Sequence, residues 1–370
     1  MRRRVAAPCA RRRLLAFLSP RTPPFPFCLE CLPVKRVRHH IPPPPHARAR
    51  LFLLALLTIA CVAPAAAQTV PQSATLPTGI NTGGTSFFDG FSKPNPGWSA
   101  IQYLRRYDFD AIKDAHGDDV PVFRDPHIGS SVWVTQVAYL SDYKLFGGSL
   151  GVTALAALVD LDTSFAYDSP VALRDNGAGL GDLTIGPYLQ MAPVIRDGRP
   201  VFSQRFELDV LAPIGKFDRN RDVNQGAGYW SVLPSWAFSI LPTPRWEISG
   251  RLNYIYNFRA DKASNVPQGE GFVFRNGQAG DAAWLNFASS LEVVKDLHLG
   301  INGYYLKQLR DNRTNGERVA DSKQTQFYLG PGLSWRIDQK NIFNANFYMP
   351  VEVRNAPSGH NVNLQYIHVF

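Results

Sequence analysis

From residue 68 onward the chain has no cysteine, because Cys9, Cys28, Cys31 and Cys61 are its whole complement. Disulfides and thiol chemistry are therefore excluded from that larger part. An excess of one charge is missing there too, since the first 67 residues hold twelve of the 39 Lys and Arg but only one acid, Glu30. The net charge of +9 thus arises in the amino-terminal segment and does not indicate nucleic-acid binding by the remainder.

A hydrophobic run long enough for a membrane-spanning helix is also missing. The longest run, at 51–62, falls short of the roughly 20 residues that a helical span needs. Arg48 and Arg50 precede it and small residues follow it, which predicts a secretory signal peptide over 48–67, cleaved after Ala67. Residues 1–47 are rich in Arg and Pro, so we expect a disordered extension or a stretch ahead of the true translation start.

Motifs for catalysis and metal binding are the third absence. After residue 67 there is no GxSxG, HExxH or P-loop sequence, and the histidines are scattered. Alternate oxygens at 218–224 have the spacing of a calcium loop, but Val223 and Tyr229 stand where that loop requires Gly and Glu. We therefore expect no enzymatic activity, no cofactor and no metal site, and a solvated polar loop at 218–224.

What the chain has instead is a two-residue alternation of polarity. In residues 360–370, Val362, Tyr366 and Phe370 lie on one face of a strand, while Asn361 and Gln365 lie on the other. An apolar outside and a polar inside are typical of a strand with lipid on one side and water on the other. A strand of a soluble sandwich also alternates, so this pattern alone leaves both folds open.

The number and spacing of such segments favour the membrane fold. Long connections alternate with short ones, the last long one being modest, as expected when extracellular loops are long and periplasmic turns short. We therefore predict an all-β, transmembrane, antiparallel up-and-down β-barrel of about 12 strands over 98–370, located in the cell outer membrane. The predicted strands are 98–109, 129–141, 149–160, 179–195, 201–212, 228–241, 245–258, 281–294, 297–309, 324–336, 341–353 and 360–370.

Three further features refine this prediction. Pro187, Pro234 and Pro331 fall inside predicted strands, and each predicts a bulge or a local break in the wall. Residues 68–97 are irregular, and we expect a periplasmic segment or a plug that fills the lumen. Aromatic residues near strand ends predict interfacial girdles, namely Trp98, Phe109, Trp230, Trp246, Phe258, Trp335 and Phe370.

The inward face of the predicted barrel carries charges of both signs and aromatic rings. Mixed charge argues against a strongly charge-selective pore, and the rings suit a small, partly apolar ligand. Tyr366 and Phe370 are predicted to form the signal for the barrel-assembly machinery. The residues predicted to line the lumen, and with it a substrate path, are Arg106, Asp182, Tyr188, Arg205, Glu207, Asp209, Glu247, Arg251, Trp284, Glu292, Tyr304, Tyr328, Arg336, Tyr348 and Glu352.

A family resemblance rests on three stretches of this sequence. They are Gly97, Trp98, Tyr103 and Tyr107, then GLGDL at 179–183 with GPY at 186–188, and, most specifically, APIGKF at 212–217 with Gly226, Gly228, Trp230 and Pro234. The chain resembles the family named for the meta-pathway of phenol degradation, SphA-like outer-membrane transporters, over about residues 98–370. Ile214 departs from the Thr that is usual in that family.

The resemblance implies a Gram-negative outer-membrane channel for passive uptake of small hydrophobic or aromatic compounds. It implies no catalytic motif and no nucleic-acid partner; outer-membrane lipid, the solute and the assembly machinery are the expected partners. Two alternatives stay open: a structural or adhesive surface barrel that acts through its long loops, and an outer-membrane hydrolase.

Overall fold

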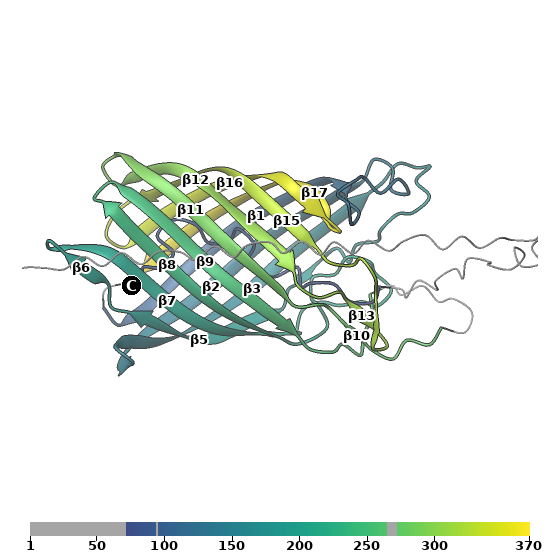
Figure 1. Cartoon of the computed structure of the whole chain (residues 1–370), viewed down its shortest axis with the longest axis horizontal. Helices are drawn as coiled ribbons and strands as arrows, with labels where there is room; N and C mark the ends of the chain where they lie inside the picture. Colours follow the sequence, from purple (N-terminus) through teal and green to yellow (C-terminus); the bar gives the residue numbers. More distant parts are fainter. Residues whose placement is uncertain (1–71, 94, 265–271) are drawn as a thin grey trace, which may run out of the picture. The chain divides into compact units, whose positions relative to one another are not determined.

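The computed structural model describes residues 72–93, 95–264 and 272–370, so the predictions for residues 1–67 lie outside the described residues. Within these ranges, twelve long strands form one continuous sheet (Figure 1). The twelve are β1 (Gly97–Ile112), β2 (His127–Leu145), β3 (Gly148–Ser164), β5 (Leu183–Met191), β7 (Arg199–Ala212), β8 (Ser231–Thr243), β9 (Trp246–Asn257), β11 (Ala282–Val294), β12 (Leu297–Gln308), β15 (Thr325–Arg336), β16 (Asn341–Arg354) and β17 (Pro357–Val369).

Five short strands accompany the twelve. β4 (Ala178–Leu180) precedes β5 and pairs with β3, and β6 (Val194–Arg196) pairs with β7. In the connections, β10 (Gly277–Gln278), β13 (Arg313–Thr314) and β14 (Glu317–Arg318) form a separate small sheet. No helix among the described residues has both the length and the apolar character needed to cross a membrane.

The sheet closes into a barrel because β1 pairs antiparallel with both β2 and β17. Tyr103 lies opposite Val134 on one side and opposite Gln365 on the other. Each successive neighbour around the ring is also antiparallel. A closed ring leaves no strand edge unpaired, which is what a sheet requires in lipid. The predicted antiparallel barrel of twelve strands is confirmed.

The outer face of this barrel is apolar and its inner face is polar, as the alternation predicted. On β9, Leu252 is 50% exposed on the outside, whereas Asn253 is 1% exposed on the inside. On β7, Leu208 is exposed and Glu207 is buried in the same way. An Arg or Lys facing the bilayer midplane would cost about 2–4 kcal/mol, so lipid enforces this segregation.

The connections at the two ends of the barrel differ in length. At the end that holds the carboxy terminus they are tight turns, such as Phe146-Gly147 between β2 and β3 (Figure 1). Both residues of that turn have positive φ, 48° and 79°, as the type I′ hairpin turn requires. The loop end carries the long connections, except that β16 and β17 extend to Asn355-Ala356. The last connection, predicted to be modest, is therefore a two-residue turn.

The three strand prolines each interrupt pairing on one side without shifting the register. The β5–β7 ladder skips the residues around Pro187, the β8–β9 ladder skips those around Pro234, and the β15–β16 ladder skips those around Pro331. A proline nitrogen has no hydrogen to donate, which accounts for the gap on that side. The predicted local breaks are confirmed.

Aromatic residues occupy both rims of the outer surface. Trp98, Trp246 and Trp335 are exposed at the turn end, and Trp230 is exposed at the loop end. Phe109 is an exception to the girdle prediction, because its side chain lines the interior. On β1 the odd-numbered residues face inward, and this parity turns Phe109 away from the lipid.

Candidate functional site

Residues 72–93, which we call the luminal segment, lie inside the barrel and contact both of its ends. At the loop end, Ser73 Oγ is 2.8 Å from Thr314 Oγ1, and the Tyr229 hydroxyl donates to a carbonyl two residues further along the segment. At the turn end, the Gly90 amide donates to Ser239 Oγ over 2.9 Å. The segment therefore runs the length of the lumen from the loop end to the turn end.

The middle of the luminal segment rests on aromatic and amide side chains of the wall. Gly83 has φ +67°, and a Cβ at this position would lie 2.9 Å from the rings of Tyr304 and Tyr348. The Tyr348 hydroxyl donates to the Gly83 carbonyl over 2.8 Å, and the Gly83 amide donates to Asn286 Oδ1 over 3.0 Å. Trp284 Nε1 donates to the carbonyl of Asn81 over 2.8 Å. Glycine is needed here because the backbone approaches the rings closely and has a left-handed conformation.

A buried ion-pair network fixes the segment nearer the turn end. Asp89 receives two hydrogen bonds from Arg251, at 2.7 Å and 2.8 Å, and lies 3.6 Å from Arg205. Glu207 pairs with both arginines, and its contact with Arg205 measures 2.9 Å. All four side chains are largely removed from solvent. Buried charges are tolerated when they are paired and hydrogen-bonded, as here.

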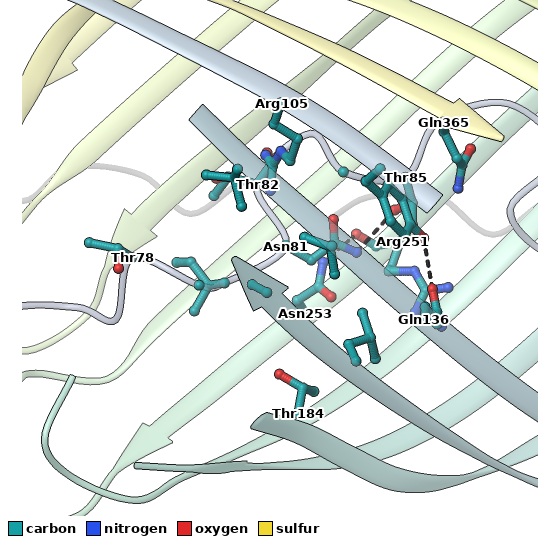
Figure 2. Close-up of a pocket in the computed structure, with 18 of the residues that line it drawn as sticks. Thr78, Asn81, Thr82, Thr85, Arg105, Gln136, Thr184, Arg251, Asn253 and Gln365 are labelled. Atoms are coloured by element: carbon teal, nitrogen blue, oxygen red, sulfur yellow. Dashed lines mark hydrogen bonds between the residues drawn. The ribbon is translucent and has the colours of Figure 1, made fainter. Parts of the chain in front are cut away.

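Beside the luminal segment a cavity of about 1050 Å³ remains open. The segment packs against the wall at β11, β12 and β16, and the free space runs mainly along β1, β2, β3, β7 and β17. Figure 2 shows Thr82 of the segment next to Arg105 of β1, which donates to the Thr82 carbonyl. The volume is at the upper end of that usual for small-molecule sites.

The cavity wall combines apolar residues with a polar belt at mid-height. Val134, Leu155 and Leu211 are among the apolar residues that line it. A polar belt crosses β1, β2 and β3, where Tyr103 donates to Gln136 over 2.8 Å and Gln136 donates to the next strand over 2.9 Å. Val134 lies opposite Tyr103 and Leu155 lies opposite Gln136, so a solute at this level would meet apolar surface and hydrogen-bonding groups side by side.

The structure divides the predicted lumen residues into three groups. The largest group lines the cavity and consists of Asp182, Arg205, Glu207, Asp209, Arg251 and Arg336. A second group contacts the luminal segment instead and consists of Glu247, Trp284, Tyr304 and Tyr348. Two tyrosines are buried beside other wall residues: Tyr188 under the guanidinium of Arg205, and Tyr328 stacked on Tyr304.

The other three predicted lumen residues belong to none of these groups, and the structure places them elsewhere. Arg106 points outward, where it donates to Ser131 over 2.9 Å, and Arg105 takes the inward position. Glu292 lies next to a register shift near a tight turn and accepts a backbone hydrogen bond there. Glu352 forms a partly exposed ion pair beyond a register shift in β16, where Val353 is buried instead.

Asp182 also explains part of the motif that carries the family resemblance. Its carboxylate accepts hydrogen bonds from the Gly215 amide at 3.0 Å and from the Ala227 amide at 2.7 Å. A Cβ on Gly215 would lie 2.7 Å from the backbone of Gly181, and one on Gly226 would lie 2.8 Å from Asp182. The glycines are required by close packing, so this motif closes the β7–β8 connection onto the start of β5.

The polar loop at 218–224 uses its oxygens internally. Asn224 Oδ1 accepts from the Asp218 amide over 2.8 Å and from Asn176 over 2.8 Å. Asp222 accepts from the Arg174 amide over 2.7 Å. These bonds join two connections at the loop end. Across the described parts of the chain, no group of three or more His, Cys, Asp or Glu side chains is placed to hold a metal ion.

The carboxy-terminal residues lie at the turn end of the wall. The Tyr366 hydroxyl donates to Asn341 Oδ1 over 2.6 Å, and the ring is partly exposed on the outside. Phe370 is exposed, and its amide donates to the carbonyl of Trp98 over 3.2 Å. This bond ties the end of the chain to the start of β1.

Two residues of the site escaped the sequence prediction. Asp89 lies in a stretch without periodicity, so no local pattern indicated its pairing with Arg251. Arg105 was not named because Arg106 was predicted to face inward, although Tyr103, buried at 6%, lies on the same face as Arg105. Tyr103 carries a polar hydroxyl that suits the lumen better than lipid, and placing it inside would have identified the inward face of β1.

Comparison with known proteins adds family and fold. The sequence profile of the family described as "Putative MetA-pathway of phenol degradation" matches residues 109–366. The COG4313 outer membrane channel from Pseudomonas putida F1 has a TM-score of 0.63 at 16% identity, with 76% of this chain and 98% of that chain covered. The translocator domain of autotransporter NalP from Neisseria meningitidis has a TM-score of 0.45 at 9% identity, with 76% and 91% covered.

A deltaS2 mutant of the TodX monoaromatic hydrocarbon channel has a TM-score of 0.39 at 8% identity, with 76% of this chain and 92% of that chain covered. None of the curated proteins compared with the chain matches it. At such identities the solved structures bear on the fold alone. A closed barrel with an apolar outer face is the architecture of the outer membrane, and the protein is located there.

Proposed function

Because the chain belongs to the family described as "Putative MetA-pathway of phenol degradation", we propose that it is a passive outer-membrane channel for small hydrophobic or aromatic compounds. The observation that carries this proposal is the cavity of about 1050 Å³ along the inner wall. Its apolar residues suit an aromatic body, and its polar belt suits a substituent. No catalytic step is part of this function, so transport is the whole activity.

The luminal segment limits what can pass. Twelve strands enclose a lumen between the filled interior of an eight-stranded barrel and the open channel of a porin. Residues 72–93 occupy part of that lumen, held by Asp89 and by bonds to Gly83. We propose that they form a plug that leaves a narrow path along one side of the inner wall. The channel would then admit small solutes and exclude larger ones.

We propose that the barrel-assembly machinery inserts the protein into the outer membrane. The outward apolar face contacts outer-membrane lipid, and the exposed end at Tyr366 and Phe370 is proposed to be the signal for the barrel-assembly machinery. Both residues lie on the outer surface at the turn end, which faces the periplasm in this topology. Their accessibility supports the proposal.

Uptake measurements test the channel function directly. Cells that lack the protein should take up radiolabelled toluene and phenol more slowly than cells that express it. Deletion of 72–93 should admit larger solutes that the complete chain excludes. Equal uptake with and without the protein would refute the channel. Cell adhesion retained by the grafted loops would then favour a surface role, and ester hydrolysis lost on one Ser or His substitution would favour a hydrolase.

A further inference from the structure

One carboxylate in the lumen has no opposite charge of its own. Arg205 and Arg251 form ion pairs with Asp89 and Glu207, and these four contacts use both guanidinium groups. Asp209 follows Glu207 on the same inner face of β7 and is 7% exposed. Among the described residues its Oδ1 atom is buried without a hydrogen-bond partner. A buried carboxylate without a partner is costly, so its environment calls for a hydrogen-bond donor.

The position of Asp209 in the cavity is favourable for a ligand. It is one of the lining residues, and it lies directly opposite Leu233 of β8, which also lines the cavity. Leu211, two residues further along β7, belongs with Leu233 to a buried apolar cluster that includes Ile80 of the luminal segment. Asp209 therefore lies between the charged Glu207 and the apolar Leu211 on the inner face of β7.

The wall next to Asp209 leaves little room for another protein donor. Gly186 of β5 faces it, and a Cβ at Gly186 would lie 2.5 Å from Asp209 Oδ1. The β5–β7 ladder skips this level because Pro187 has no amide hydrogen. Oδ1 is thus closed off by the wall at a residue without a side chain, and a molecule in the cavity can reach the carboxylate only at its other oxygen, Oδ2.

From this geometry we propose that Asp209 is the recognition point for transported molecules that carry a hydrogen-bond donor on an apolar body. The donor is a hydroxyl or an ammonium group, and the body lies against Leu211 and Leu233. This inference rests on the proposed channel function and adds a preference within it. A neutral molecule of the same shape without a donor would leave the carboxylate unpaired and would be taken up more slowly.

Paired probes test this preference. Phenol and anisole differ chiefly in the hydroxyl hydrogen, and benzylamine supplies the ammonium group. With the complete chain, phenol uptake should exceed anisole uptake by about tenfold or more, as expected for one hydrogen bond to a charged group. Asp209→Leu should abolish the preference by lowering phenol uptake to the level of anisole uptake, and Asp209→Asn, which keeps a neutral acceptor, should reduce it. Glu352→Gln, which removes a charge away from the cavity, should retain it.

The possible outcomes separate this inference from the channel function. Equal uptake of phenol and anisole by the wild type, or a preference that survives in both Asp209 variants, would overturn the recognition role and leave the channel standing. No uptake of any probe above that of cells lacking the protein would overturn the channel itself. Preference for benzylamine or for phenol identifies the donor as cationic or neutral. Heat-modifiable gel migration confirms that each variant is folded, and the Leu variant provides the test if the Asn variant fails to assemble.

Discussion

At Arg251 a single guanidinium holds two carboxylates that come from opposite parts of the chain. Asp89 belongs to the luminal segment and Glu207 to β7, and both are within hydrogen-bonding distance of the same side chain. Removing one member of a buried network leaves the other charges without compensation. The network therefore couples the position of the segment to the stability of the wall.

Arg251→Met should destabilise the folded barrel by about 3–5 kcal/mol, because Asp89 and Glu207 would stay buried with one cation between them. Urea unfolding followed by tryptophan fluorescence measures the change. Arg354→Met breaks a half-exposed pair with Glu352 and should cost no more than about 1 kcal/mol. Equal losses in the two variants would contradict a special role for the buried network.

The residues of β1 show why the facing of a single side chain was mispredicted. Its inner face carries Ile101 and Tyr103 as well as Arg105, while its outer face carries polar Gln102 and Arg106. Both faces of β1 thus carry polar and apolar residues, so the alternation of polarity does not show which face is inside. On β7 and β9 the faces differ sharply, and there the sequence predicted them correctly.

At the scale of the strand, the side that a residue faces decides whether a charge is tolerated. Leu158→Arg places a cation on the lipid face of β3, where Leu158 is 54% exposed, and should cost about 2–4 kcal/mol. Leu155→Arg makes the same change on the cavity side of the same strand and should assemble normally. Heat-modifiable migration of membrane extracts compares the two. Assembly of both variants to the same extent would contradict the assigned facing.

The connection between β3 and β4 contains a carboxylate whose pKa predicts an acid limit for loop order. Burial raises the pKa of Asp175, but hydrogen bonds from the Thr163 hydroxyl at 2.9 Å and from the Gly177 amide at 2.9 Å outweigh burial and hold the pKa below its ordinary value. A lowered pKa means that the stabilisation is complete above the unfolded value of about 4 and is lost as the pH falls through the folded value.

A spin label at Tyr167→Cys, the most exposed aromatic position of this loop, reports the loss of order. Its mobility should stay constant from pH 7 to about 5 and rise in more acidic solution. With Asp175→Ala added, the label should be mobile at every pH. A label whose mobility in the parent loop does not respond to acid would show that Asp175 does not order the loop.

Twelve strands and the parity of their connections were predictable because both follow from local signals. Alternation identifies a strand, and Gly, Asn and Asp identify a turn. The ends of β16 and β17 were predicted less well, since the chain around Asn355 carries polar residues that suit a loop as well as a tight turn. Strands were predictable within the apolar band, because lipid there requires apolar side chains outside and polar side chains inside. Beyond the band this difference is lost, and strand ends were predicted less well.

For the whole molecule, the decisive contacts are between residues very far apart in sequence. Asn363 donates to the carbonyls of Gly83 and Gly84, and Asn286 donates to the carbonyl of Asn81. The luminal segment supplies backbone groups rather than a pattern of side chains, so its course through the barrel leaves no trace in periodicity. The wall supplies the side-chain amides that bind these backbone groups. In the sequence, such asparagines cannot be told apart from other inward polar residues.

The direction of the luminal segment has a consequence for surface display. Ser73 lies among the long connections, so the described part of the segment begins at the loop end of the lumen and continues into β1 at the turn end. An epitope inserted after Gln72 should bind antibody on intact cells, whereas one inserted in the tight turn at 244–245 should bind only after the envelope is opened. Antibody access in the reverse order would mean that the chain crosses the barrel the other way.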